Sequence, residues 1–228
     1  MMFAATALTL FPEAFPGTLG LSLLGRGLRD GQWTLDTVNL REFGIGPHKN
    51  VDDTPAGGGA GMVFRPDVVA AALDSIGRGG RPIVCLSPRG APVTQAHVAD
   101  WAAGPGLVVF CGRFEGVDER VIEARGMQEI SVADVVLAGG EAAALVLIEA
   151  CVRLLPGILG NQASIVEESF SDGLLEHPQY TRPRVWEGRE IPDILLSGDH
   201  GKVAAWRLEQ RLRLTAQRRP DLMAKRRS

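Results

Sequence analysis

The sequence predicts an α/β fold with a largely parallel sheet, because short apolar runs alternate with longer amphipathic segments. The candidate strands are residues 5–11, 82–87, 107–111 and 134–138. The segments 65–78, 94–103, 115–125 and 141–155 have helical spacing or strong helix formers. This order favours right-handed crossovers between parallel strands. After Pro156 the pattern becomes polar and glycine-containing, which indicates a linker or mobile lid before a smaller helical domain.

Composition is typical of a globular protein with a sizeable core. The chain has 228 residues, of which 45% are hydrophobic. The apolar N-terminal run lacks a basic leader and is interrupted by Pro12 and Glu13, so we expect a first strand there and no membrane span. Cys85, Cys111 and Cys151 lie far apart without metal-ligand spacing, which predicts reduced core thiols and a cytoplasmic location.

Charge is distributed unevenly along the chain. Residues 201–228 contain nine Lys or Arg and two acids, which gives this segment a net charge of +7. Because the overall net charge is −3, the first 200 residues carry a net charge of −10. The basic segment is consistent with a solvated helix or with a surface that contacts phosphates. Its helical spacing predicts an apolar face with Ala204, Leu208 and Leu212, and a second face with Arg207, Arg211 and Arg218.

Three glycine-containing loops each follow a predicted strand: "LSPRG" (86–90), "FCGRFEG" (110–116) and "LAGGE" (137–141). In open α/β sheets, ligands bind beyond the carboxyl ends of the strands, so together these loops predict a small-molecule site. The dinucleotide fingerprint GxGxxG is absent. "GGGAGM" (57–62) lacks the Lys-Ser/Thr of a nucleotide triphosphate loop, and we interpret it as a flexible connection.

These and other motifs resemble the bacterial tRNA (guanine-N1)-methyltransferase family of the SPOUT superfamily. The resemblance covers nearly the whole chain and rests on these motifs: "LFPEAF" (10–15), "VDDTPAGGGAGM" (51–62), "LSPRG", "CGRFEGVDERVIE" (111–123), "DVVLAGGE", "RLLPGILGN" (153–161), "HPQYTRP" (177–183), "LLSGDH" (195–200) and "WRLEQ" (206–210). It implies a SPOUT-like catalytic domain with a deep trefoil knot over 1–159, a linker or lid over 160–175 and a basic helical tRNA-binding domain over 176–228. It also implies a homodimer whose active site is shared between subunits.

The resemblance implies that S-adenosylmethionine binds in the knot, held by the three loops, with the glycines making room for it. The matching cofactor-binding positions are Leu86, Ser87, Pro88, Gly112, Glu115, Val132, Ala133, Asp134, Val135, Val136, Leu137, Gly139 and Gly140. Family members are associated with a magnesium requirement, but the sequence shows no ligand cluster that would place the ion.

The implied reaction is methylation of guanine N1 at tRNA position 37, next to the anticodon. N1 carries a proton at neutral pH, so a general base must reach a nucleotide swung out of its stack. The resemblance assigns this role to Glu168, where the family commonly has aspartate, and Glu167 is the competing candidate. Arg153 matches the arginine that stabilises charge on O6. From composition alone, Glu168 would be a solvated linker charge and Arg153 a cation at a helix C-terminus.

The tRNA anticodon arm is the implied partner. The segments that would shape its site contain Asp52, Asp53, His177, Arg182, His200, Lys202 and Arg207. By residue type alone, the aspartates are turn residues beside Pro55 and the histidines are surface residues.

Two alternative functions remain open. A related SPOUT enzyme that methylates a ribose hydroxyl or another RNA would share the knot loops, but not the order of "HPQYTRP" and the lid carboxylates. A non-catalytic RNA-binding module with a degenerate cofactor pocket is favoured by Cys85 and Val135, which replace aromatic residues, and by Glu168.

Overall fold

The computed structural model describes residues 2–160 and 168–226, which belong to two compact units, Met1–Gly160 and Asn161–Ser228. The first unit contains a five-stranded sheet in the order β2-β1-β6-β5-β7, and all its strand pairs are parallel. Its strands are β1 (Phe3–Thr9), β2 (Trp33–Asn39), β5 (Ile83–Pro92), β6 (Gly106–Cys111) and β7 (Gln128–Ser131). The predicted α/β fold with a parallel sheet is therefore confirmed.

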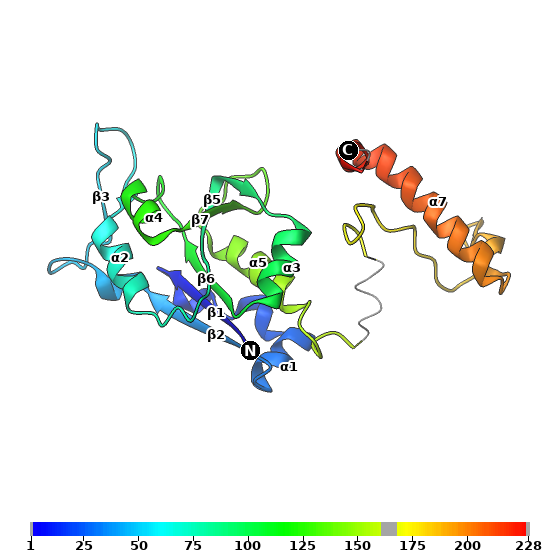
Figure 1. Ribbon diagram of the computed structural model, residues 1–228, viewed down its shortest axis with the longest axis horizontal. Helices are drawn as coiled ribbons and strands as arrows, with labels where there is room; N and C mark the ends of the chain where they lie inside the picture. The colour runs from blue at the N-terminus through cyan, green and yellow to red at the C-terminus, as the bar shows by residue number, and fades with distance from the viewer. Residues whose placement is uncertain (1, 161–167, 227–228) are drawn as a thin grey trace. The chain divides into compact units, whose positions relative to one another are not determined.

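Helices cover both faces of this sheet. Figure 1 shows α2 and α4 on one side of the strands and α3 and α5 on the other. The helices of this unit are α1 (Ser22–Arg29), α2 (Pro66–Asp74), α3 (Gln95–Ala103), α4 (Glu119–Arg125) and α5 (Glu141–Val152). A short antiparallel pair, β3 (Asp52–Asp53) and β4 (Val63–Phe64), precedes α2.

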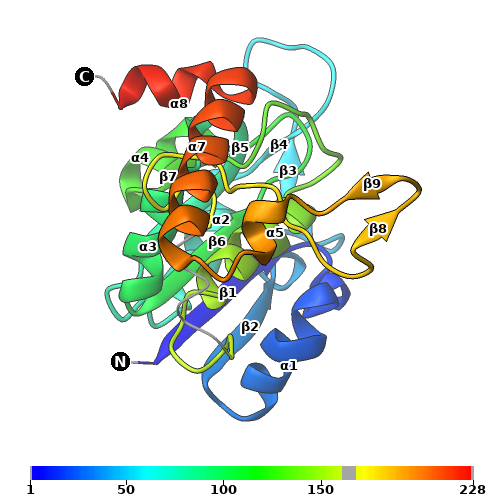
Figure 2. The same cartoon turned by 90° about the vertical axis from the view of Figure 1, so that its right-hand side faces the viewer.

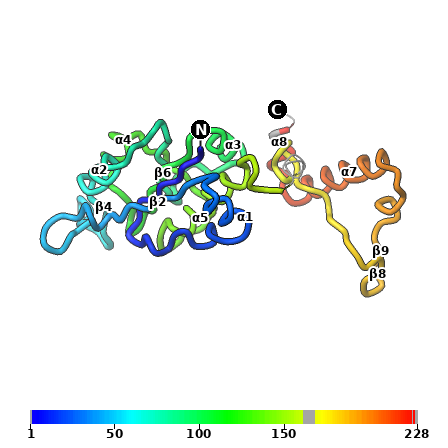
Figure 3. Tube along the Cα trace, turned by 90° about the horizontal axis from the view of Figure 1, so that it is seen from below, coloured from blue at the N-terminus to red at the C-terminus, as the bar shows by residue number. Residues whose placement is uncertain are grey.

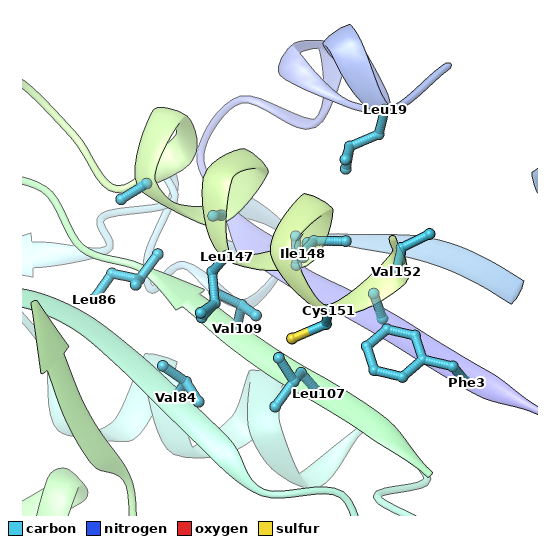
Figure 4. Close-up of a cluster of buried hydrophobic side chains, with 14 of the residues drawn as sticks. Phe3, Leu19, Val84, Leu86, Leu107, Val109, Leu147, Ile148, Cys151 and Val152 are labelled. Atoms are coloured by element: carbon cyan, nitrogen blue, oxygen red, sulfur yellow. The ribbon is translucent and has the colours of Figure 1, made fainter. Parts of the chain in front are cut away.

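Alternation along β6 separates the core into two layers. Leu107, Val109 and Cys111 face the cluster under α3 and α5, whereas Val108 and Phe110 face the cluster under α2 and α4. Every residue of β6 is buried, as expected for a central strand between two helical layers. Figure 4 shows α5 above the strands, with Leu147 directed toward them, and Ile148 and Val152 belong to the same buried cluster. Burying each of these side chains stabilises the fold by about 2 kcal/mol.

The run 134–138 is not a strand, which corrects the prediction. The strand of this region is β7, and it ends at Ser131. Val135, Val136 and Leu137 lie in an irregular segment with their side chains exposed, Val136 to 84%. A β-branched run has strand propensity, but here it follows the end of the last sheet strand and finds no neighbouring strand to pair with.

Other boundaries differ from the predictions. Strand β2 was not predicted from the sequence, because it is an edge strand with little buried surface. Helix α1 was not predicted either, because it contains two glycines. The helix predicted over 115–125 begins at Glu119, because residues 112–117 form a loop and Asp118 caps the helix by accepting a hydrogen bond from the Arg120 backbone.

The second unit is built on α7 (His200–Arg218), followed by α8 (Pro220–Lys225). A small antiparallel hairpin, β8 (Val185–Trp186) with β9 (Arg189–Glu190), precedes these helices. Residues 168–175 pack within this unit: Leu174 is fully buried and the Leu175 backbone N–H donates to Thr215 Oγ1 at 2.8 Å.

The predicted faces of α7 are partly wrong. Ala204 and Leu208 are exposed, whereas Arg211 is largely covered and donates from Nε to the Leu175 carbonyl at 3.3 Å. Its guanidinium also pairs with Asp172. The segment that packs on α7 presents backbone carbonyls and a carboxylate, so an arginine matches it better than a leucine does.

Candidate active site

A cavity of about 310 Å³ lies at the carboxyl ends of β5, β6 and β7 in the first unit. Its walls are the loop after Leu86, the loop 112–117 and the segment 129–140, with Ala143 from the start of α5. All the residues predicted to bind the cofactor line this cavity except Asp134, which is exposed and is not part of the wall. The three loops that the sequence singled out therefore converge on one site.

A bulge in β5 forms the first wall. Leu86 and Ala91 both pair with Ile130 of β7, so residues 87–90 leave the ladder and turn toward the cavity. Gly90 is required there because a Cβ would lie 2.4 Å from the Ile130 nitrogen. Arg89 anchors the bulge by donating to Glu129 of β7 at 2.7 Å and to Glu119 of α4, and these hydrogen bonds raise its pKa.

Gly140 is required by the approach of one loop to another. Its N–H donates to the Gly112 carbonyl at 2.8 Å, and an added Cβ would lie 2.8 Å from Cys111 Cα. The segment 132–140 can therefore lie against the end of β6 only if residue 140 lacks a side chain. The resemblance implies that this glycine makes room for a cofactor. The structure gives a different reason for it, the close contact between two loops.

Glu141, the carboxylate that follows the two glycines, belongs to a buried network. Its Oε1 accepts a hydrogen bond from Thr9 Oγ1 at 2.7 Å, and its Oε2 accepts one from Arg113 Nη2 at 2.9 Å. The Thr9 hydroxyl in turn accepts from the Phe11 backbone N–H, and the Arg113 guanidinium lies 4.2 Å from the centre of the Phe11 ring. Glu141 thus ties β1, the 112–117 loop and α5 together at the cavity wall.

The 112–117 loop is also held from the side of β3 and β4. The Glu115 N–H donates to the Met62 carbonyl at 2.9 Å, and the Phe64 N–H donates to the Gly116 carbonyl at 2.9 Å. Phe114, just before Glu115, has a positive φ of 61°, which is unusual for a residue with a side chain, and its ring packs against Phe64. Backbone strain of this kind clusters at binding sites, where surrounding contacts enforce it.

Four residues that line the cavity were not among the predicted site residues: Arg89, Arg113, Phe114 and Glu129. Arg113 and Phe114 belong to the "CGRFEG" motif, so the motif signalled them. Nothing local in the sequence indicates Glu129, because its position depends on the pairing of β7 with β5.

The three cysteines are free and buried, as predicted. Burial raises the pKa of the Cys85 thiol and that of the Cys151 thiol to about 12, and it raises the pKa of Cys111 well above its ordinary value. All three thiols are therefore protonated at neutral pH, and none is suited to act as a nucleophile.

The predicted catalytic residues do not line this cavity. Arg153 caps the C-terminus of α5, whereas the cavity lies at the N-terminus of the same helix. At 1.5 Å per residue these ends are roughly 18 Å apart. Glu168 belongs to the second unit, is half-buried, and accepts a hydrogen bond from the Ser171 N–H through its carbonyl. Glu167 lies outside the described residues.

The predicted substrate-binding residues occupy both units. In the first, Asp52 and Asp53 form β3, and Asp53 pairs with Arg65 at 3.2 Å. In the second, His177 is buried beside Trp206, with ring centroids 6.5 Å apart, while the remaining members are exposed: Arg182, His200, Lys202 and Arg207. Lys202 pairs with the helix-capping Asp199 at 3.1 Å.

Two features are absent from residues 2–160 and 168–226. These residues contain no group of three or more His, Cys, Asp or Glu that could hold a metal ion. They also contain no helix of the length and apolarity needed to cross a membrane.

Comparison with known proteins decides the family. Residues 3–225 match the family model described as tRNA (Guanine-1)-methyltransferase TrmD. The chain belongs to this family. It is 60% identical over 225 residues to the tRNA (guanine-N(1)-)-methyltransferase of Mesorhizobium japonicum, covering 98% of this chain and 97% of that protein. It is 59% identical to the Agrobacterium fabrum protein of the same name (99% and 97% covered) and 60% identical to that of Rhodopseudomonas palustris (99% and 92%).

The family membership confirms the resemblance drawn from the sequence motifs. It identifies the chain as a methyltransferase, and methyl transfer by this family implies S-adenosylmethionine as the donor. The cavity volume lies within the range of small-molecule sites, and its wall combines apolar side chains, several glycines and a few polar and charged side chains, which suits such a molecule.

Proposed function

We propose that this protein transfers a methyl group from S-adenosylmethionine to N1 of the guanine at position 37 of tRNA, next to the anticodon. The observation that carries the proposal is the cavity at the carboxyl ends of β5, β6 and β7, whose wall contains the "LSPRG", "CGRFEG" and "LAGGE" segments. A tRNA substrate and three buried thiols both fit a cytoplasmic location.

The bound donor supplies an electrophilic methyl carbon on a positively charged sulfur. Glu168 takes the N1 proton of the guanine, so that the N1 electron pair forms the new bond to the methyl carbon as the carbon–sulfur bond breaks. The negative charge that develops on O6 during this step is stabilised by Arg153. The proton remains on the carboxyl of Glu168 until solvent removes it.

Two observations support a homodimer with a shared active site. Arg153 and the cavity lie at opposite ends of α5, so an arginine at position 153 does not reach the cavity of its own chain. In addition α5 is apolar on nearly all sides, yet Ala142 and Val146 on its outer face are exposed in the single chain. A helix that is hydrophobic all round is normally buried, and a second copy would bury this one.

The path of the chain near the cavity supports the trefoil knot. β5 lies between β6 and β7 in the sheet, yet the segment that follows β7 returns past the end of β5 to contact Cys111 and Gly112 at the end of β6. The segment lines the same cavity as the 87–89 part of the bulge and then enters α5, which packs on β6 and β1. A trefoil knot would require this returning segment to thread through the loop that precedes it, and its return to the end of β6 supports that proposal.

The second unit provides the proposed tRNA surface. Arg182, His200, Lys202 and Arg207 are exposed on it, and the surrounding segment 201–228 carries the +7 charge. Contacts of this kind position an RNA through its phosphates. In the first unit Asp52 and Asp53, next to the loop that holds Glu115, would border the entrance for the flipped base.

Methyl transfer from labelled S-adenosylmethionine to matched tRNA transcripts with guanosine or adenosine at position 37 tests the proposal. We expect 1-methylguanosine only with the guanosine transcript. Glu168→Gln should abolish the product while cofactor binding is kept, whereas Glu167→Gln, at the competing position, should leave the product; loss of the product in Glu167→Gln alone would assign the base to Glu167. Cofactor and tRNA binding without any methylated base would instead favour the non-catalytic RNA-binding module. Methylation of a ribose would favour the related SPOUT activity.

A further inference from the structure

The β8–β9 hairpin is a tight turn with no core of its own. Its two-residue strands are joined by Glu187 and Gly188, whose φ angles of 49° and 74° fit a two-residue hairpin turn. One further hydrogen bond, from the Ile191 N–H to the Arg184 carbonyl at 3.0 Å, extends the pairing. Figures 2 and 3 show the hairpin projecting away from α7 within the second unit.

Large apolar side chains on this hairpin are exposed. Every residue from 181 to 190 is exposed, and Trp186 has 56% and Val185 49% of its surface accessible. A hairpin of this size gains little stability by itself, because three strands or a packed face are normally needed. Exposure of an indole ring at its centre indicates that a binding partner covers it.

The residues around Trp186 indicate which kind of molecule would cover its ring. The Arg189 guanidinium lies 5.9 Å from the centre of the Trp186 ring. Arginines outnumber acidic residues in the exposed stretch 181–190, which contains Arg182, Arg184 and Arg189 but only two acids, Glu187 and Glu190. A protein interface usually surrounds such a ring with apolar residues at its core, whereas an exposed aromatic ring beside a guanidinium group is a combination that stacks on unpaired bases and contacts their phosphates.

We propose that Trp186 and Arg189 form a stacking surface for an unpaired base of the RNA substrate. This inference rests on the proposed function, which supplies a tRNA with an unpaired anticodon loop. The hairpin would then contribute affinity through one stacked base, in addition to the phosphate contacts of α7.

Binding of an anticodon stem-loop RNA, measured by fluorescence anisotropy together with KM for full-length tRNA, tests the proposal. Trp186→Ala should weaken RNA binding about tenfold, within the range for loss of one base–aromatic stack, and Trp186→Phe should stay within about threefold of wild type. Arg189→Gln keeps the ring and should cost about threefold. Gln217→Ala is the control, because Gln217 is an exposed, uncharged residue of the same unit that is not among the residues assigned to the tRNA site.

Cofactor affinity and oligomeric state complete the test. Both should be unchanged in all four variants. Unaltered RNA affinity in Trp186→Ala and Arg189→Gln would overturn the inference while the proposed function stands, provided that wild type still methylates tRNA. A shift of Trp186→Ala from dimer to monomer would also overturn it, because the hairpin would then contact a second copy of the chain. Absence of methylation by wild type would instead be a failure of the proposed function.

Discussion

At the scale of single residues, Glu141 is the carboxylate on which the cavity wall depends. Glu141→Gln keeps the size of the side chain but loses the charge-assisted hydrogen bonds to Arg113, while Thr9 still has an acceptor. We expect the free energy of unfolding to fall by about 2 kcal/mol, which is typical for a hydrogen bond to a charged group. Urea unfolding measures this change.

Glu123 on α4 provides the control. It is exposed, so Glu123→Gln should change the free energy of unfolding by less than about 0.5 kcal/mol. Equal effects of the two substitutions would mean that the network around Glu141 contributes no more than an ordinary surface carboxylate does.

The buried thiols predict a pH dependence above neutrality. The pKa of Cys151 is about 12 in the folded protein against an ordinary value of 9.0, so the folded state favours the protonated thiol. Its contribution to stability is fully present below pH 9 and is lost as the pH rises from 9 toward 12, at about 1.4 kcal/mol per pH unit. Urea unfolding at pH 8 and pH 10.5 should show a smaller loss in Cys151→Ala than in wild type. Identical losses would contradict the prediction.

At the scale of elements, the helix α5 and the loop before it determine the shape of the cavity. Gly140→Ala would place a Cβ 2.8 Å from Cys111 Cα, so the loop 132–140 must move away from the end of β6. We expect the dissociation constant for S-adenosylmethionine to rise more than tenfold, measured by calorimetry, because several walls of the cavity move together. Gly77→Ala is the control, since an added Cβ there meets nothing within 4 Å. Unchanged affinity in Gly140→Ala would show that the loop is free to adjust.

The central strands β1, β5 and β6 and the helices α2, α3, α4 and α5 could be predicted from the sequence, because buried apolar runs and helical spacing are local signals. The edge strand β2 could not, since only its first residue is fully buried. The run 134–138 was mistaken for a strand because its composition does not reveal whether a partner strand is available.

The candidate site shows the same division between local and long-range information. The motifs located the loops that line the cavity, including Leu86, Gly112 and Gly140. They did not indicate that Glu129 enters the wall through the pairing of β7 with β5, or that Glu141 reaches back to Thr9, 132 residues earlier in the sequence. Contacts of such sequence separation follow from the topology of the sheet rather than from any local pattern.

At the scale of the whole molecule, the homodimer proposed above would divide each active site between two chains. The cavity wall belongs to the first unit, Glu168 belongs to the second, and Arg153 lies at the far end of α5 from the cavity. In a twofold-symmetric dimer each cavity would be completed by residues of the other subunit. Two inactive variants that carry defects in different parts of the site should then restore each other.

Heterodimers of Gly140→Ala and Glu168→Gln, purified through two different affinity tags, test this arrangement. If the lid of one subunit serves the cavity of the other, each heterodimer has one site with an intact cavity and an intact Glu168, and its second site carries both defects. Methylation at a limiting cofactor concentration should then reach about half of the wild-type rate, because one of two symmetric sites is restored. Each variant homodimer should be nearly inactive while it keeps its helical circular dichroism. If Glu168 instead serves the cavity of its own chain, every site in the heterodimer carries one defect, and no activity above that of the homodimers should appear.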